Sequence, residues 1–102
     1  MNVPRSQNLV RLTFEGGFNA DDEADAEDRG YRSLVWAELD DGTRHALTFY
    51  DMARLGQTLQ DEFDAGRPYF SEPGLVVVPR VTRDAMESAA RKLAQDGFFA
   101  RR

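Results

Sequence analysis

The residues of this chain best suited to acid–base chemistry are its sole histidine, His45, and the nearby carboxylate of Glu38. Asp41-Gly42 lies between them and favours a two-residue hairpin turn, which would place the two side chains opposite each other. A carboxylate facing an imidazole can hold the ring as a general base. No nucleophile accompanies the pair at a recognisable turn, and hairpin tips are wet. A hydrolase-like enzyme using His45 and Glu38 is therefore the least favoured of three hypotheses.

A second chemical feature is a dense run of carboxylates without any Lys or Arg among them. Its members are Asp21, Asp22, Glu23, Asp25, Glu27 and Asp28. These six supply −6 and the formal net charge is −5, so all other residues together carry +1. A calcium loop of the EF-hand type starting at Asp21 would need glycine at its sixth position, which is Ala26. We therefore expect no metal site here.

The acidic run has two interpretations. Ala24 and Ala26 are its only apolar members, too few to anchor it, so we expect residues 18–30 to form a mobile, solubilising loop. Deleting residues 19–29 should then leave folding intact. The alternative is electrostatic, because such a tract could serve an acidic inhibitor or immunity-type protein that neutralises a basic partner.

Other functional classes are disfavoured by composition. The chain has no cysteine, which excludes disulfides and thiolate chemistry and is compatible with a reducing cytoplasm. The glycines match neither a dinucleotide fingerprint nor a phosphate loop, so no cofactor is expected. From Pro79 onward the net charge is +3, but a pI of about 4.8 opposes binding to nucleic acid.

Membrane association is not expected either. The longest apolar run, Leu75 to Pro79, is too short to cross a bilayer, and the N-terminus lacks the apolar stretch of a secretory signal. We therefore expect a single cytoplasmic domain over residues 1–102.

Three strands precede the first expected helix. Residues 9–15 alternate, with Val10, Leu12 and Phe14 on one face, as in a half-buried strand. Two further strands, 31–39 and 43–50, flank Asp40-Asp41-Gly42 as a hairpin.

The hairpin has two possible registers. A two-residue turn pairs Glu38 with His45, whereas a three-residue loop with Gly42 left-handed pairs Glu38 with Arg44 and puts Val35 opposite Leu47. The two registers exchange the faces. Since three consecutive residues, 34–36, are apolar, the hairpin must lie inside the sheet or carry a partner on its second face.

Two helices and one strand complete the expected fold. Asp51 caps a helix to about residue 65, and Gly66 and Pro68 end it. The apolar stripe of this helix is Met52, Leu55, Leu59 and Phe63. Residues 75–78 form a strand buried on both faces, and a second helix starts at Thr82 and ends at Gly97.

These elements predict an α+β two-layer sandwich in β-β-β-α-β-α order. We expect a four-stranded mixed sheet with both helices on one face, which leaves the other face open. The residues that could bind a partner there are aromatic or large apolar side chains: Tyr31, Leu34, Trp36, Tyr50 and Tyr69. The leading hypothesis is a small non-enzymatic interaction module that binds another protein or a second copy of itself.

Overall fold

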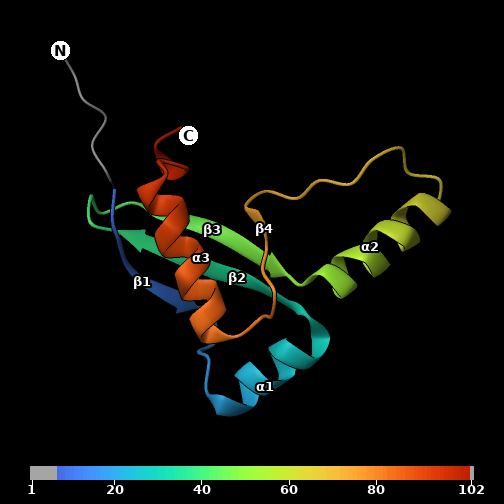
Figure 1. Cartoon of the computed structure of the whole chain (residues 1–102), viewed down its shortest axis with the longest axis horizontal. Coiled ribbons are helices and arrows are strands. Elements are labelled where there is room, and N and C mark those ends of the chain that lie inside the picture. Colours follow the sequence, from blue (N-terminus) through green and yellow to red (C-terminus); the bar gives the residue numbers. More distant parts are fainter. Residues whose placement is uncertain (1–6, 102) are drawn as a thin grey trace.

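The computed structural model describes residues 7–101 and shows a four-stranded mixed sheet with three α-helices (Figure 1). The elements in chain order are β1 (Leu9–Phe14), α1 (Ala20–Arg29), β2 (Tyr31–Leu39), β3 (Arg44–Tyr50), α2 (Met52–Asp64), β4 (Leu75–Val77), α3 (Arg83–Gln95) and a short 3-10 turn (Phe99–Arg101). The α+β class and the mixed sheet are confirmed. The expected element order was wrong, because it lacked α1.

The sheet has the order β1-β2-β3-β4, antiparallel except for the parallel pair β3 and β4. Its hairpin adopts the three-residue-loop register, with Glu38 opposite Arg44 and Val35 opposite Leu47. Gly42 takes φ +86°, the left-handed geometry that this loop requires. The register is favoured because it brings the apolar residues of both strands onto one face, where α3 covers them.

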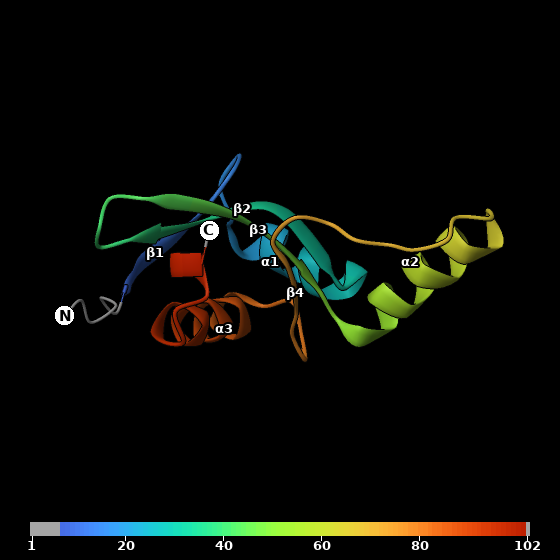
Figure 2. The ribbon, with the colours of Figure 1, turned by 90° about the horizontal axis from the view of Figure 1, so that it is seen from above.

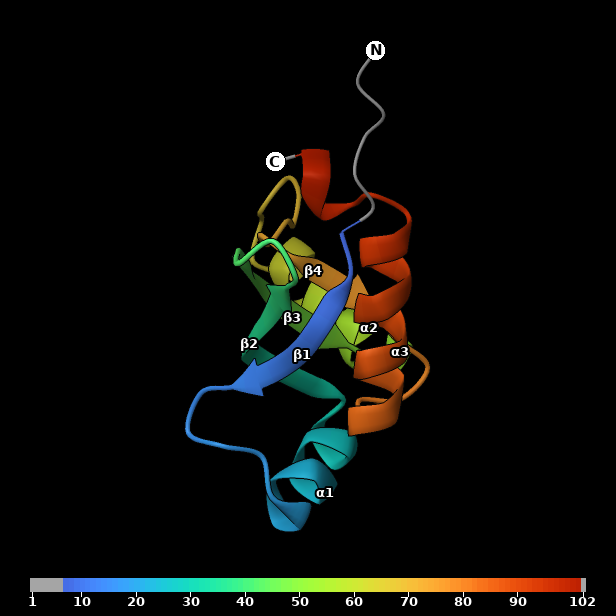
Figure 3. The ribbon, with the colours of Figure 1, turned by 90° about the vertical axis from the view of Figure 1, so that its left-hand side faces the viewer.

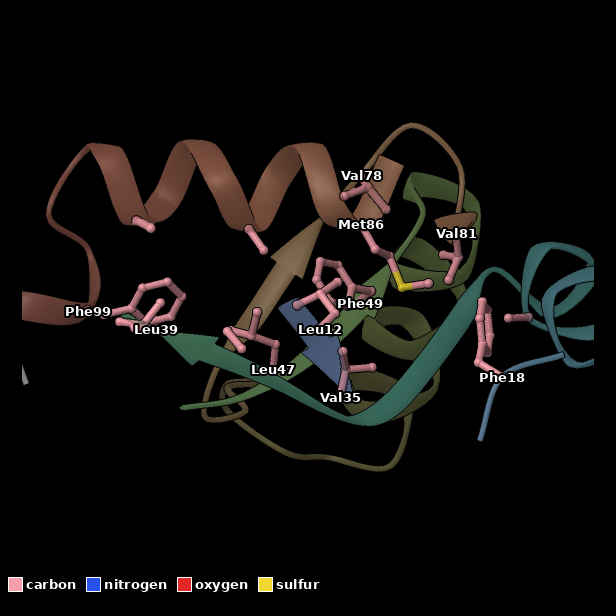
Figure 4. Close-up of a cluster of buried hydrophobic side chains, with 14 residues drawn as sticks. Leu12, Phe18, Val35, Leu39, Leu47, Phe49, Val78, Val81, Met86 and Phe99 are labelled. Atoms are coloured by element: carbon pink, nitrogen blue, oxygen red, sulfur yellow. The ribbon is translucent and has the colours of Figure 1, made fainter. Parts of the chain in front are cut away.

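Helix α3 covers that face, and the hydrophobic core lies between helix and sheet (Figures 2 and 3). Figure 4 shows the core side chains of the sheet and of α3 pointing toward one another. The largest fully buried ones are Phe49, Leu47, Met86, Val35 and Val81. Small residues on α3 let the helix sit close to the strands, as Ala90 and Ala94 are also buried there. The expected start of this helix, with the Thr82 side chain accepting a hydrogen bond from the Ala85 N–H, is confirmed.

Two strand predictions need correction. In β1 a bulge between Leu9 and Arg11 breaks the alternation, so Leu9 packs on the core while Val10 is 51% exposed. Strand β4 is not buried on both faces. It forms one edge of the sheet, and Val77 is 47% exposed. Neither a bulge nor an edge position is encoded in the apolar pattern of a single strand.

The acidic run forms helix α1 rather than the expected loop. Asn19 begins it with a capping box, in which the Asn19 side chain accepts from the Asp22 N–H and the Asp22 carboxylate accepts from the Asn19 N–H. Carboxylates in the first turn favour the positive end of the helix dipole. Gly30, in the left-handed conformation at φ +67°, ends the helix.

Helix α1 is tied to the body by contacts that the acidic run did not reveal. Ala26 is only 3% exposed and belongs to the core. The Glu23 carboxylate accepts a 2.7 Å hydrogen bond from the backbone N–H of Arg83, and so caps the start of α3. The Arg83 guanidinium donates to the Phe18 carbonyl at 2.6 Å. Deleting residues 19–29 would remove these contacts, so we now expect that deletion to destabilise the fold.

Helix α2 does not lie on the sheet with α3. It projects from the end of β3, and residues 65–74 return beside it to β4 (Figures 1 and 2). None of the residues Met52–Asp64 is buried. The expectation of both helices on one face was therefore wrong. An apolar stripe shows that a helix has a partner surface, but it does not identify which surface that is.

Candidate functional site

The most exposed large apolar side chain of the described residues, Met52, lies on α2. We call the side chains of Met52, Leu55, Leu59 and Phe63 the α2 stripe. Met52 is 81% exposed and Phe63 is 49% exposed, while Leu55 and Leu59 are half-buried. A helix of 13 residues is marginal in water unless its apolar face is packed. The α2 stripe is therefore a surface that a partner would stabilise.

Contacts at the first turn attach α2 to the body. The Asp51 carboxylate accepts a 2.7 Å hydrogen bond from the Arg54 N–H and caps the helix. The Arg54 guanidinium lies 5.3 Å from the centre of the Tyr31 ring. Gly30 packs directly on Asp51, because a Cβ at Gly30 would lie 2.4 Å from that carboxylate. These contacts define the direction in which the helix leaves the sheet.

The returning segment 65–74 flanks one side of α2. Arg67 pairs with Glu62 at 3.5 Å, and Phe70 packs edge-on against Tyr50 with ring centres 6.4 Å apart. A shallow hollow of about 390 Å³ lies between helix and segment. Tyr69 stands at its rim and is 70% exposed. Leu55 and Leu59 are thus the half-buried members of the α2 stripe, while Met52 and Phe63 are its exposed members.

The five side chains proposed from the sequence as a partner site do not form one surface. Tyr50 is 4% exposed, and its ring lies 5.0 Å from that of Tyr31. Trp36 is half-buried under the Arg44 guanidinium, 4.7 Å from the ring centre. Leu34 and Tyr69 are exposed, but they lie on different elements. Tyr31 contacts the first turn of α2 through Arg54, and Tyr69 lies in the segment that flanks α2.

Leu34 carries backbone strain. It is the one non-glycine residue with positive φ among those described, at +57°, and it sits in the bulge between Arg32 and Val35. Its carbonyl accepts a hydrogen bond from the Glu15 N–H, which holds the bulge against β1. The exposure of Leu34 therefore follows from the bulge that turns it away from the core.

Tyr50 is predicted to make stability fall at alkaline pH. Burial, a 2.8 Å hydrogen bond to Glu72 and the negative charge of Glu72 raise the pKa of Tyr50 above its ordinary value of 10. The folded state therefore keeps a proton that the unfolded chain loses above about pH 10, so the contribution is complete below that pH and lost above it. Urea unfolding between about pH 8 and about pH 11 should show a steeper loss for the parent chain than for Tyr50→Phe. Equal slopes would contradict this.

The acid–base pair expected from the alternative register does not form. His45 lies opposite Ala37 on the core side, with its ring 4.7 Å from Phe99. Glu38 is on the other face, where Arg11 lies 3.1 Å and Arg44 3.6 Å from its carboxylate. The pairing was wrong because the three-residue loop shifts β3 by one residue. His45 instead shares a hydrogen bond of 3.0 Å with the Thr43 hydroxyl.

Among residues 7–101, no three His, Cys, Asp or Glu side chains are grouped closely enough to hold a metal ion. Within the same residues, no helix is long and apolar enough to cross a membrane. A second hollow of about 270 Å³ lies between α1 and β2 and contains charges of both signs. Two of these are already paired, as Asp25 and Arg29 lie 3.1 Å apart.

The comparisons with known proteins return no relative: no protein-family model matches the chain, and neither a curated protein nor a solved structure is significantly similar to it. The candidate site therefore depends on geometry. The sequence identified the α2 stripe but assigned it to the core. A signal that could have corrected this is Gly56, an unfavourable residue within the helix that lies on the stripe's own face.

Proposed function

We propose that the protein is a small non-enzymatic interaction module that binds the apolar surface of another protein, or of a second copy of itself, through the α2 stripe. The observation that carries the proposal is the exposure of Met52 and Phe63 on a capped, amphipathic helix with no buried residue. Covering a fully exposed side chain of this size contributes about 1.5–3 kcal/mol, and covering the half-buried Phe63 contributes less. The first-turn contacts of α2 support the proposal, because a helix already attached to the body loses less entropy on binding than a free segment would. A cytoplasmic location, compatible with the cysteine-free sequence, is part of it.

The open face of the sheet is less suited to this role. The indole ring of Trp36 on this face is covered by the Arg44 guanidinium. Beside it Glu38 is paired with Arg11 and Arg44, and accepts a hydrogen bond from the Thr13 hydroxyl. Burying this charged network under a partner would require its desolvation. We therefore place the binding surface on α2 and Tyr69 rather than on the sheet.

A second candidate function is the acidic inhibitor. It is favoured by α1, where Asp21, Asp25 and Asp28 recur at helical spacing and all three are exposed. The expected partner is a protein with a basic surface. Binding of this kind would weaken strongly with salt, whereas binding through the α2 stripe would not.

Site-specific photocrosslinking in the cells that make the protein tests the proposal. A photoreactive residue at position 63 should form a covalent adduct with another polypeptide, because Phe63 faces outward on the stripe. Position 57, exposed on the opposite side of α2, is the matched control and should give none. Position 24 on α1 reports on the inhibitor alternative. Equal labelling from positions 63 and 57 would refute the role of the α2 stripe.

A further inference from the structure

Four positions on one face of α2 have a spacing that reads the same in both directions. Met52, Gly56, Leu59 and Phe63 are separated by four, three and four residues. This is the spacing of a helix seam that packs against another helix. In an antiparallel pair with a twofold axis between positions 57 and 58, Met52 faces Phe63 and Gly56 faces Leu59. The same register repeats across the axis, so the seam is complementary to itself.

We propose that the partner of this chain is a second copy of it, with the two α2 helices packed antiparallel. The inference rests on the proposed function and names its partner. It makes Leu59 of each copy a knob that fits the space at Gly56 of the other. In the described structure, no heavy atom lies within 4 Å of the position a Cβ would take at Gly56. Glycine there serves no packing within the chain, and it destabilises the helix by about 1 kcal/mol relative to alanine.

The charges of α2 support an antiparallel arrangement. Helices α1 and α3 carry acids in the first turn and a base in the last, as the helix dipole favours. Helix α2 has no acid in its first turn and no base in its last. Arg54 lies near its positive end, and Asp61 and Asp64 lie near its negative end. In an antiparallel pair, each acidic last turn lies at the same end as the positive first turn of the other copy, with Arg54 and Asp61 on the face of α2 away from the seam.

The position of the body is compatible with this pairing. Each body lies at the N-terminal end of its α2, as Figure 1 shows. Antiparallel packing therefore places the two bodies at opposite ends of the helix pair, which is about 20 Å long. A parallel pair would bring the two bodies to the same end and align the like ends of the dipoles.

Sedimentation equilibrium of the purified full chain, from about 1 to about 200 µM, is the first test. The mass should rise with concentration toward twice the 11.5 kDa of one chain. One short helix per copy gives an interface below about 1,200 Å², so half-dissociation is expected in the micromolar range. A mass that stays at 11.5 kDa throughout overturns the inference.

Gly56→Gln separates an interface role from a structural one. Glutamine is the better helix former, so the variant should gain helical circular dichroism at concentrations where the chain is monomeric. Its side chain fills the space for Leu59, so the dissociation constant should rise at least about tenfold. Gln57→Ala, on the opposite side of α2, is the control and should change it by less than about twofold. A Gly56→Gln chain that dimerises like the parent refutes the knob-and-space contact.

The absence of cysteine from the sequence allows a direct test of orientation. Met52→Cys and Phe63→Cys chains are mixed in equal amounts and oxidised in a glutathione buffer. An antiparallel pair brings positions 52 and 63 within disulfide reach. Disulfides between a Met52→Cys chain and a Phe63→Cys chain should therefore make up more than half of all disulfides, which is the share expected from random pairing. An excess of 52–52 and 63–63 disulfides would refute the antiparallel pair.

The outcome of crosslinking distinguishes this inference from the proposed function. An adduct from position 63 with twice the mass of the chain supports both. An adduct of any other mass, together with a monomer in sedimentation, leaves the interaction module standing and refutes the second copy. No adduct at position 63 refutes the module itself.

Discussion

Replacing Gly74 with alanine is expected to lower the free energy of unfolding by about 3 kcal/mol or more. Gly74 has φ +71°, and a Cβ there would lie 2.1 Å from the carbonyl oxygen of Ala46. The oxygen belongs to the backbone of β3, which cannot shift without disturbing the sheet. The Gly74 carbonyl also accepts a 2.9 Å hydrogen bond from the Thr48 N–H, which starts the pairing of β4 with β3. The substitution should therefore detach β4.

Gly66→Ala is the matched control. Gly66 also has positive φ, at +87°, but no heavy atom lies within 4 Å of its Cβ position in the described structure. Only the left-handed strain of about 1 kcal/mol is then expected. Urea unfolding of both variants measures the difference. Equal losses of unfolding free energy in the two variants would show that the close approach of Gly74 to the Ala46 carbonyl does not set the cost of the substitution. The result bears on function, because Gly74 anchors the segment that returns from α2.

The second large effect is expected at Ala26 of the acidic helix. Ala26→Glu should destabilise the protein by about 3 kcal/mol or more, because it would place a charge and four extra heavy atoms into the core. Ala24→Glu adds the same charge to the same helix at an exposed position, so a change within about 0.5 kcal/mol is expected. Thermal unfolding of the two variants makes the comparison. If both variants unfold at the same temperature as the parent chain, α1 is not packed as the structure shows.

This comparison also decides how the acidic run should be interpreted. In the structure, part of its charge is used locally: Asp22 caps α1 itself and Glu23 caps α3. The exposed members are the ones available for a basic partner. A large loss for Ala26→Glu alone would show that the helix is part of the fold, and that its electrostatic role must be tested by single charge removals rather than by deletion.

Local patterns identified much of the secondary structure. Asp51, Gly66 and Thr82 marked helix ends that are found where expected, because capping depends on residues within one turn of each other. The hairpin at Asp41-Gly42 was also recognised, and one of its two possible registers is the observed one. The choice between them required the face that α3 covers, which is information from residues far along the chain.

The errors share a cause as well. Helix α1 was missed because its composition is acidic, whereas its stability comes from the Asn19 cap and from Ala26 packing on distant elements. The bulges in β1 and β2 were missed because a bulge depends on the neighbouring strand. The separation of His45 from Glu38 follows from the same kind of long-range choice. Each error concerns a contact between segments that the local pattern does not contain.

By itself, the sequence determined the α+β class, the amphipathic α2 with its stripe, and the spacing from Met52 to Phe63. Those properties depend on residue type and on the fixed geometry of a helix or strand. Only the tertiary structure decided that Met52 and Phe63, the two ends of the stripe, are exposed. Helix α3 covers one face of the sheet and encloses the core there. Helix α2 is capped one residue after β3 and leaves in a different direction. A candidate core helix thereby becomes the surface on which we expect a second copy to pack.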